Sequence, residues 1–266
     1  MACSALVDVM LKAARKASKG ILRDFGEIVS LQTSIHGPVE FVTAAIMRVK
    51  DILSVELSKA YPFSVISEGK EIFGGTDKSC TWIVTPVDGI KNLLHGIPLL
   101  ATSIALERYG VIIAGVIYNP VTGELFVAER GKGAYLNDRR LRVSSRKQLS
   151  GSLIGTNFFG VDQMWTKMRF QELFRLRSNK ASIRLLGCCS LSLAYVASGG
   201  FDGYIEENKS VALGIGAAGL LIVREAGGFT SDYYGKDNTA SSNSVVAGNE
   251  DIHRLLLSVI SHSKEQ

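Results

Sequence analysis

The chain has 266 residues, of which 46% are hydrophobic and 21% charged, and its formal net charge is +5. This composition excludes an intrinsically disordered chain, and the length suits one large domain or two small ones that share an interface. The mild basic excess is more typical of a solvated surface than of a nucleic-acid groove. The longest uncharged run near the C-terminus, between Lys209 and Arg224, falls short of the roughly 20 residues that cross a bilayer, so no membrane partner is expected.

Cysteine usage and the N-terminus indicate the cellular setting. The chain has four cysteines, without CxxC or His/Cys spacing, which argues against zinc and favours reduced, mostly buried thiols. The N-terminus lacks the layout of a signal peptide. We therefore expect a cytoplasmic protein.

The first part of the chain is expected to be helical and then antiparallel. Apolar residues at helical spacing predict one helix within residues 1–25 and a second over Val39–Lys59. Turns are expected at Tyr109-Gly110, at Asn119-Pro120 and around Gly131–Gly133, with the antiparallel sheet continuing beyond the last of them to Asn137. The expected strands are Phe63–Ile66, Thr81–Val84, Thr102–Arg108, Val111–Tyr118 and Glu124–Arg130.

The polar stretch Val143–Gly151 is the expected boundary between two halves, residues 1–145 and residues 146–266. Strands and helices alternate beyond it, which predicts an α/β half after an α+β half. The elements expected there are the strands Leu153–Thr156, Ser182–Leu185 and Gly203–Glu206 and the helices Gln163–Leu176, Ser190–Ser198 and Leu213–Ala226.

The segment TWIVTPVDGIKN (Thr81–Asn92) has the layout of a metal or phosphate site. It predicts a buried strand, a proline-centred turn and the pair Asp88-Gly89 ahead of a helix. A carboxylate and a glycine before a helix N-terminus suit a metal ion or a phosphate. A second interpretation is that Asp88 is the N-cap of the helix that begins near Ile90.

Several long, ordered motifs resemble the inositol monophosphatase family, over nearly the whole chain, and look closest to its bacterial SuhB-like branch. The resemblance implies an α+β class protein with a layered αβαβα fold, a homodimer, and Mg²⁺-dependent hydrolysis of small phosphomonoesters. It rests on EFVTAAIMRV (Glu40–Val49), VISEGKE (Val65–Glu71), WIVTPVDGIKN (Trp82–Asn92), PLLATSIAL (Pro98–Leu106), GVIYNPVTGELFVAERGKGAYLN (Gly115–Asn137), LAYVASGGFDGYIE (Leu193–Glu206) and AAGLLIVREAGG (Ala217–Gly228).

Part of the family's site is retained in this sequence. The resemblance implies metal ligands at Glu68, at Asp88 and at the main-chain carbonyl of Val87. It also implies a substrate contact at Glu206, although two extra residues separate Glu206 from the next motif. Glu68 has a second interpretation as an ordinary strand-end acid. The phosphate-binding backbone N–H groups would be those of Gly89, Ile90 and Lys91.

Other parts of that site are missing. Thr85, Ile215 and Ile46 stand where the family has aspartate ligands, and Ile90 replaces the threonine that orients the attacking water. An aliphatic side chain cannot bind a divalent ion, so Mg²⁺ binding is expected to be weak or absent. We therefore assign no catalytic residue and expect weak or no phosphatase activity.

Two functions remain open. One is a degenerate family member with a regulatory or scaffolding role in transcription, in which Arg139–Lys147 and Lys167–Arg184 are candidate contacts for the transcription machinery or RNA, or else plain solvated faces. The other is an active Mg²⁺-dependent phosphatase for inositol 1-phosphate or a related sugar phosphate. Its site would be rebuilt around Glu68 and Asp88, with Glu40, Glu71 or Glu206 as further acids.

A metal-free anion site is a third expectation. The helix N-terminus at Gly89–Lys91 has free N–H groups and a partial positive charge. Lys91 and Lys70 would supply the charge that Mg²⁺ brings in the family. A small phosphate or other anion is therefore a candidate ligand.

Overall fold

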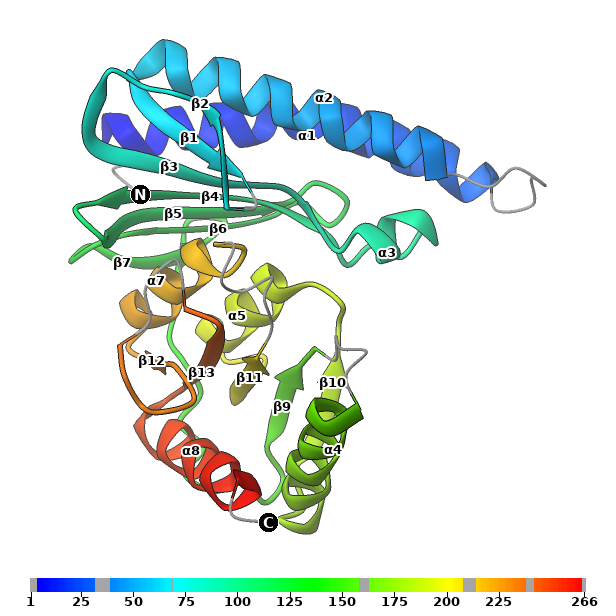
Figure 1. The fold of residues 1–266 in the computed structure, drawn as a ribbon, viewed down its shortest axis with the longest axis vertical. Helices are drawn as coiled ribbons and strands as arrows, with labels where there is room; N and C mark the ends of the chain where they lie inside the picture. Colours follow the sequence, from blue (N-terminus) through cyan, green and yellow to red (C-terminus); the bar gives the residue numbers. More distant parts are fainter. Residues whose placement is uncertain are drawn as a thin grey trace.

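The computed structural model describes residues 4–31, 39–67, 69–157, 163–207, 214–237 and 242–264. Figure 1 shows five stacked layers: a helix pair, a large sheet, a second helix pair, a smaller sheet and a last helix pair. This order confirms the expected layered αβαβα fold. The helices are α1 (Ala5–Leu31), α2 (Val39–Ala60), α3 (Ile90–Leu94), α4 (Gln163–Ser178), α5 (Cys189–Ala197), α7 (Ala217–Glu225) and α8 (Glu250–Lys264).

The large sheet has eight strands in the order β2-β1-β3-β4-β5-β6-β7-β8. All neighbouring pairs in it are antiparallel except β1 and β3, which run parallel. The strands are β1 (Phe63–Ser67), β2 (Lys70–Phe73), β3 (Asp77–Asp88), β4 (Ala101–Arg108), β5 (Val111–Asn119), β6 (Glu124–Glu129), β7 (Gly133–Leu136) and β8 (Arg139–Arg140).

The smaller sheet has five strands in the order β10-β9-β11-β13-β12. Its parallel part is β10-β9-β11, and β13 pairs antiparallel with both β11 and β12. The strands are β9 (Leu153–Thr156), β10 (Ser182–Leu185), β11 (Gly203–Glu207), β12 (Phe229–Ser231) and β13 (Ser244–Gly248).

The outer helix pair covers one face of the large sheet (Figure 1). The apolar stripe of α2 includes the buried residues Val42, Val49 and Leu53, and it shares one hydrophobic core with α1 and with Trp82 of β3. Burying such a stripe removes apolar surface from water. Each Å² of apolar surface that is buried contributes about 25 cal/mol to the stability of the packed helices. The helical spacing seen in the sequence is therefore confirmed for both helices.

The middle helices α5 and α7 are largely buried because both sheets cover them. Every residue of α7 from Ala217 to Val223 is buried. Gly115 of β5 lets this helix approach closely, since a Cβ there would lie 3.0 Å from the carbonyl oxygen of Ala218. The core between the sheets therefore depends on small residues at the contact.

Several sequence-based boundaries differ from the structure. The helix predicted over Leu213–Ala226 begins at Ala217, because the turn at 214–216 has Gly214 at φ +83. Leu213 itself lies outside the described residues. The strand predicted over Thr81–Val84 extends from Asp77 to Asp88, through Pro86. The predicted continuation of the antiparallel sheet beyond the turn around Gly131–Gly133 is confirmed as β7. Elements that the sequence pattern did not predict are β2, β8, β12, β13 and α8.

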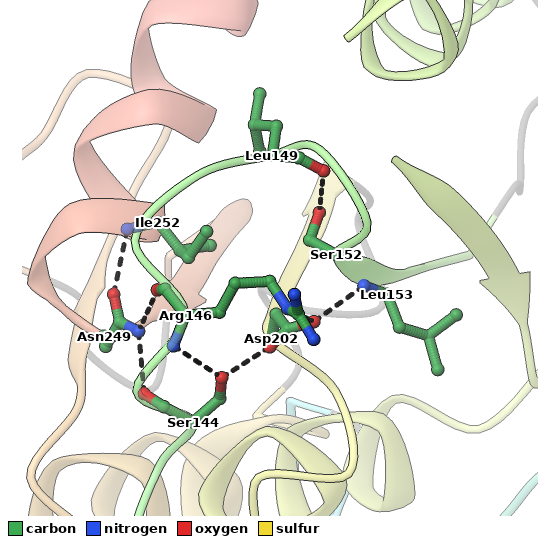
Figure 2. A network of polar contacts seen from close by, with 8 residues as sticks. All are labelled: Ser144, Arg146, Leu149, Ser152, Leu153, Asp202, Asn249 and Ile252. Atoms are coloured by element: carbon green, nitrogen blue, oxygen red, sulfur yellow. Dashed lines mark hydrogen bonds and ion pairs between the residues drawn. The ribbon is translucent and has the colours of Figure 1, made fainter. Parts of the chain in front are cut away.

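The segment between the two sheets is the stretch of chain that leads from β8 to β9, residues 141–152. A polar network around Asp202 holds it in place (Figure 2). The carboxylate of Asp202 accepts hydrogen bonds from Ser144 Oγ, from Arg146 Nε at 3.2 Å and from the backbone N–H of Leu153 at 2.7 Å. Asn249 Nδ2 donates to the carbonyl oxygens of Ser144 and Arg146, both at 2.7 Å. The predicted division between residues 145 and 146 falls within this segment and stays a prediction.

Candidate functional site

Asp88 ends β3, and Gly89 leads directly into α3, so the predicted junction of strand and helix is confirmed. The turn predicted around Pro86 is wrong, because β3 continues through Pro86 to Asp88. Gly89 has φ +89, and a Cβ at this position would lie 2.6 Å from the carbonyl oxygen of Leu99. Glycine is therefore required by both conformation and space. The N-cap of α3 is Gly89. The alternative interpretation of Asp88 as the N-cap of this helix is therefore wrong.

The carboxylate of Asp88 is bound to a different helix. Its Oδ2 atom accepts a hydrogen bond from the backbone N–H of Ser190 at 2.7 Å. Ser190 lies in the first turn of α5, whose N-cap is Cys188. Free N–H groups and the helix dipole favour a negative charge at this end of α5. Burial nevertheless raises the pKa of Asp88, against the opposing effect of the hydrogen bonds from Ser190.

Ile215 also contacts Ser190. Ser190 Oγ donates a hydrogen bond to the carbonyl oxygen of Ile215 at 3.2 Å. The side chain of Ile215 is partly buried and packs against the core between the two sheets. The fold therefore brings Asp88 and Ile215 together through Ser190, at two positions where the family resemblance implies metal ligands. The side chain at 215 offers no ligand atom.

The two predicted positions within β3 are buried. Thr85 is 3% exposed and lies opposite Ser103 of β4. Val87 is also buried and belongs to the core under α1 and α2. The sheet therefore holds a neutral hydroxyl at position 85, where the resemblance implies a carboxylate.

Glu206 is a second buried acid. One of its carboxylate oxygens accepts hydrogen bonds from the Tyr204 hydroxyl and from Asn157 Nδ2, the latter at 3.4 Å. Its pKa is raised by burial, and the charge of Asp88 raises it further. The pKa values of the Cys188 and Cys189 thiols are raised by burial and by these same two acids. One buried cluster therefore holds two carboxyl groups and two thiols.

The thiols were predicted to be reduced and buried. Cys80, Cys188 and Cys189 are all free and buried, which confirms that prediction for the cysteines that the structure describes. Their raised pKa values keep Cys188 and Cys189 in the thiol form near neutral pH. These two residues are therefore poor nucleophiles.

Sequence reasoning missed several residues that build the site. Asn92 Nδ2 donates to the carbonyl oxygens of Leu99 and Leu186, both at 2.7 Å, and so joins α3 to the segment before α5. Asn92 belongs to the motif that follows Asp88, so the motif could have indicated it. Ser190 and Asn157 carried no comparable signal, because each acts across the fold rather than along the chain.

The remaining predicted residues lie on other elements. Glu68 lies outside the described residues. Ile46 is partly buried on α2 and packs against the core of the large sheet, as an apolar residue should. The predicted residues at exposed positions are Glu40 on α2, Lys70 and Glu71 on β2, and Ile90 and Lys91 on α3.

The described residues do not fit the two-metal site that the resemblance implies. Hard cations such as Mg²⁺ need several oxygen ligands. In the described part of the chain, no three His, Cys, Asp or Glu side chains are grouped so that they could hold a metal ion. Asp88 is engaged by Ser190, and neither Thr85 nor Ile215 supplies a carboxylate.

The sequence and the fold are similar to those of known proteins along almost their full length. The model of the inositol monophosphatase family matches residues 4–265. An inositol-1-monophosphatase of Mesorhizobium japonicum is 48% identical over 261 residues, covering 98% of this chain and 97% of the relative. The Nus factor SuhB of Pseudomonas aeruginosa is 38% identical over 260 residues, covering 96% of this chain and 95% of the relative.

The solved structures agree. The extragenic suppressor protein SuhB of Bartonella henselae superposes with a TM-score of 0.86 and 42% identity, over 97% of this chain and 98% of that one. The chain therefore belongs to the inositol monophosphatase family. Of the helices that the structure describes, none combines the length and the apolar character that crossing a bilayer requires.

Proposed function

We propose that this chain is a family member with weak or no phosphatase activity that acts through binding, in a regulatory or scaffolding role in transcription. The contact of Ser190 with both Asp88 and Ile215 supports the first part of this proposal, which is the weak or absent phosphatase activity. At the point where two metal ligands would converge, one carboxylate is bound to a helix terminus and the other is replaced by an aliphatic side chain. Mg²⁺ binding is correspondingly expected to be weak or absent.

A phosphate-release assay with inositol 1-phosphate and excess Mg²⁺ tests the loss of activity. We expect release at the background rate for the wild type, with no change in Asp88→Asn. Turnover that Asp88→Asn abolishes would contradict the proposal. A variant with Thr85→Asp, Ile215→Asp, Ile46→Asp and Ile90→Thr is the matched gain-of-function control, and activity in this variant would support the assignment of the lost positions.

The alternative function is an active Mg²⁺-dependent phosphatase for inositol 1-phosphate or a related sugar phosphate. Two observations favour it: the 48% identity to an inositol-1-monophosphatase, and the placement of Asp88 and Glu206 close enough for each charge to raise the pKa of a common set of groups. In this alternative Glu68 is the further ligand, and Glu206→Gln should raise KM more than it lowers kcat, because Glu206 would contact substrate hydroxyls.

The proposed binding role draws on the relatives and on one surface. Two relatives carry the name Nus factor SuhB, in Pseudomonas aeruginosa and in Escherichia coli. In this chain, α4 exposes Phe170 and Phe174, 60% and 74% exposed, beside Lys167 and Arg175. A face that combines exposed aromatic rings with basic side chains suits a protein partner. It lies within the predicted contact stretch Lys167–Arg184.

Binding of the purified chain to purified bacterial RNA polymerase tests this surface. We expect the double variant Phe170→Ser/Phe174→Ser to weaken binding at least tenfold, as loss of aromatic anchors does. Charge reversal at Lys12, exposed on α1, is the control and should leave binding unchanged. Sedimentation of the same variants tests the homodimer, which we propose from the family resemblance. Loss of the dimer without any change in polymerase binding would assign the face to self-association.

Anion binding at the turn between β3 and α3 is a separate part of the proposal. The exposed Lys91 follows Gly89 at the start of a helix of five residues. Such a short helix supplies a small dipole, so we expect phosphate to bind weakly, with Lys91→Ala removing the binding. Calorimetry with inorganic phosphate at neutral pH measures it.

A further inference from the structure

A cavity lies away from the Asp88 cluster, between the turn of the β4–β5 hairpin and the C-terminal end of α7. Its volume is about 370 Å³, near the lower end of the range of roughly 300–1,000 Å³ typical of small-molecule sites. It is lined by Gly110, Val111, Ile112, Arg130, Leu220, Leu221, Arg224, Glu225 and Asp237.

Two arginines face this cavity above an apolar floor. Arg224 is held in place, since its Nε atom donates to Thr230 Oγ1 at 2.7 Å. The exposed guanidinium of Arg130 makes no hydrogen bond or ion pair with any residue that the structure describes. The leucines of α7 and Ile112 supply the apolar surface. The cavity therefore joins one positive charge that is held in place, on Arg224, and one that is exposed, on Arg130, to an apolar wall.

Two acids, Glu225 and Asp237, also line this cavity. The two carboxylate oxygens of Glu225 accept hydrogen bonds from the backbone N–H groups of Gly131 and Gly133, both at 2.8 Å. Asp237 is 3.8 Å from Arg224, but its side chain is 97% exposed, and such ion pairs contribute little. Burial lowers the pKa of Arg224, the charge of Asp237 raises it, and repulsion from Arg130 lowers it. An anion between the two arginines would relieve this repulsion.

We propose that this cavity binds a small organic anion, with a phosphate or carboxylate group between Arg130 and Arg224 and an apolar body against Leu220 and Leu221. Guanidinium groups bind both kinds of anion through paired, charge-assisted hydrogen bonds. The apolar wall favours an organic anion over free inorganic phosphate, because its burial adds to the affinity.

The site is separate from the Asp88 cluster. The two lie at opposite ends of α7, a helix of nine residues that is about 13 Å long. Ile215, which contacts Ser190, precedes the start of this helix, whereas Arg224 and Glu225 end it. The proposal therefore does not depend on whether the Asp88 cluster retains any activity.

Titration calorimetry with phenyl phosphate, benzoate and inorganic phosphate tests the proposal. We expect phenyl phosphate or benzoate to bind at millimolar concentration or tighter, and inorganic phosphate to bind at least several-fold more weakly. Whichever of the two organic ligands binds more tightly shows whether the site prefers a phosphate or a carboxylate group. Arg130→Gln should weaken binding by about tenfold or more, since a hydrogen bond to a charged group contributes about 1.5–3 kcal/mol. This variant removes no side-chain hydrogen bond or ion pair within the described chain, so its thermal stability should match the wild type.

Two matched variants complete the experiment. Arg184→Gln changes an exposed arginine on β10 and should leave binding unchanged. Lys91→Ala should also leave it unchanged, which separates this cavity from the turn at α3. The proposal is wrong if neither organic ligand binds, if Arg130→Gln binds like the wild type, or if Lys91→Ala abolishes the binding.

Discussion

The backbone N–H of Ser190 donates a hydrogen bond to Asp88, 2.7 Å away, although 102 residues separate the two in the chain. The bond joins the end of a strand in the large sheet to the first turn of a helix between the two sheets. The acid for which the family resemblance implies a role as metal ligand thus accepts a hydrogen bond that joins two parts of the tertiary structure. We expect its removal to lower the stability of the fold.

Replacing Asp88 separates its role as an acceptor from its charge. Asp88→Ala leaves the N–H of Ser190 without this partner and should lower the free energy of unfolding by about 1–2 kcal/mol, as loss of a helix cap does. Asp88→Asn keeps an acceptor oxygen and should stay within about 1 kcal/mol of the wild type. Urea unfolding at neutral pH measures both. If Asp88→Ala and Asp88→Asn lower the free energy of unfolding equally, the charge of Asp88, and not its hydrogen bond, stabilises the fold.

Glu206 should make stability depend on pH. Burial raises its pKa above the ordinary value of 4.5, so the folded state holds the proton more tightly than the unfolded state. The resulting stabilisation is present below the ordinary pKa and is lost as the pH rises through the raised pKa. Glu206→Gln keeps an acceptor without the charge. Its melting temperature should exceed that of the wild type at pH 8 by a few degrees, each kcal/mol being worth about 2–4 °C in a chain of this size.

The pH profile supplies the control for this prediction. The gap between Glu206→Gln and the wild type should close below pH 4.5, where both forms are neutral. Glu206→Ala removes the acceptor for Tyr204 and Asn157 and should be less stable at every pH. A difference in melting temperature between Glu206→Gln and the wild type that stays constant over the whole pH range would contradict the prediction.

Gly89 should tolerate no side chain. Gly89→Ala places an L-residue at φ +89 and a Cβ atom 2.6 Å from the carbonyl oxygen of Leu99. The left-handed conformation alone costs roughly 1–2 kcal/mol, and the clash adds to it. Gly123→Ala is the matched control, because φ is +72 there and no atom lies within 4 Å of the added Cβ. Denaturant unfolding should show Gly89→Ala to be the more destabilised variant by at least about 1 kcal/mol.

Asn249 has two separable roles in the network of Figure 2. Its Oδ1 atom accepts from the backbone N–H of Ile252 at 2.9 Å, whereas Nδ2 binds the segment between the sheets. Asn249→Ser keeps a cap but loses the donor, and Asn249→Ala loses both. We expect serine to be the more stable of the two by about 1 kcal/mol. Limited proteolysis between residues 143 and 152 should accelerate equally in both variants, and protection in the serine variant would contradict this assignment.

The sequence alone determined the local elements with clear patterns. The helical stripe of α2 and the turn that Gly89 forms follow from residue spacing and from the conformational freedom of glycine. The motifs also determined the family, which the 48% identical relative confirms. The short strand β13 escaped prediction, because a fully buried strand of five residues has no alternation of polar and apolar residues. The preceding β12 has only three residues, too few to show a period.

Only the tertiary structure decided what the surviving acids contact. Nothing near Asp88 in the chain indicates Ser190, and nothing near Glu206 indicates Asn157. These contacts arise because β3, α5 and β11 come together in space, and their energetics depend on burial. The sequence determined that Asp88 ends a strand before a helix. The packing of the second half of the chain against it decided that this carboxylate accepts a hydrogen bond from the N-terminus of α5.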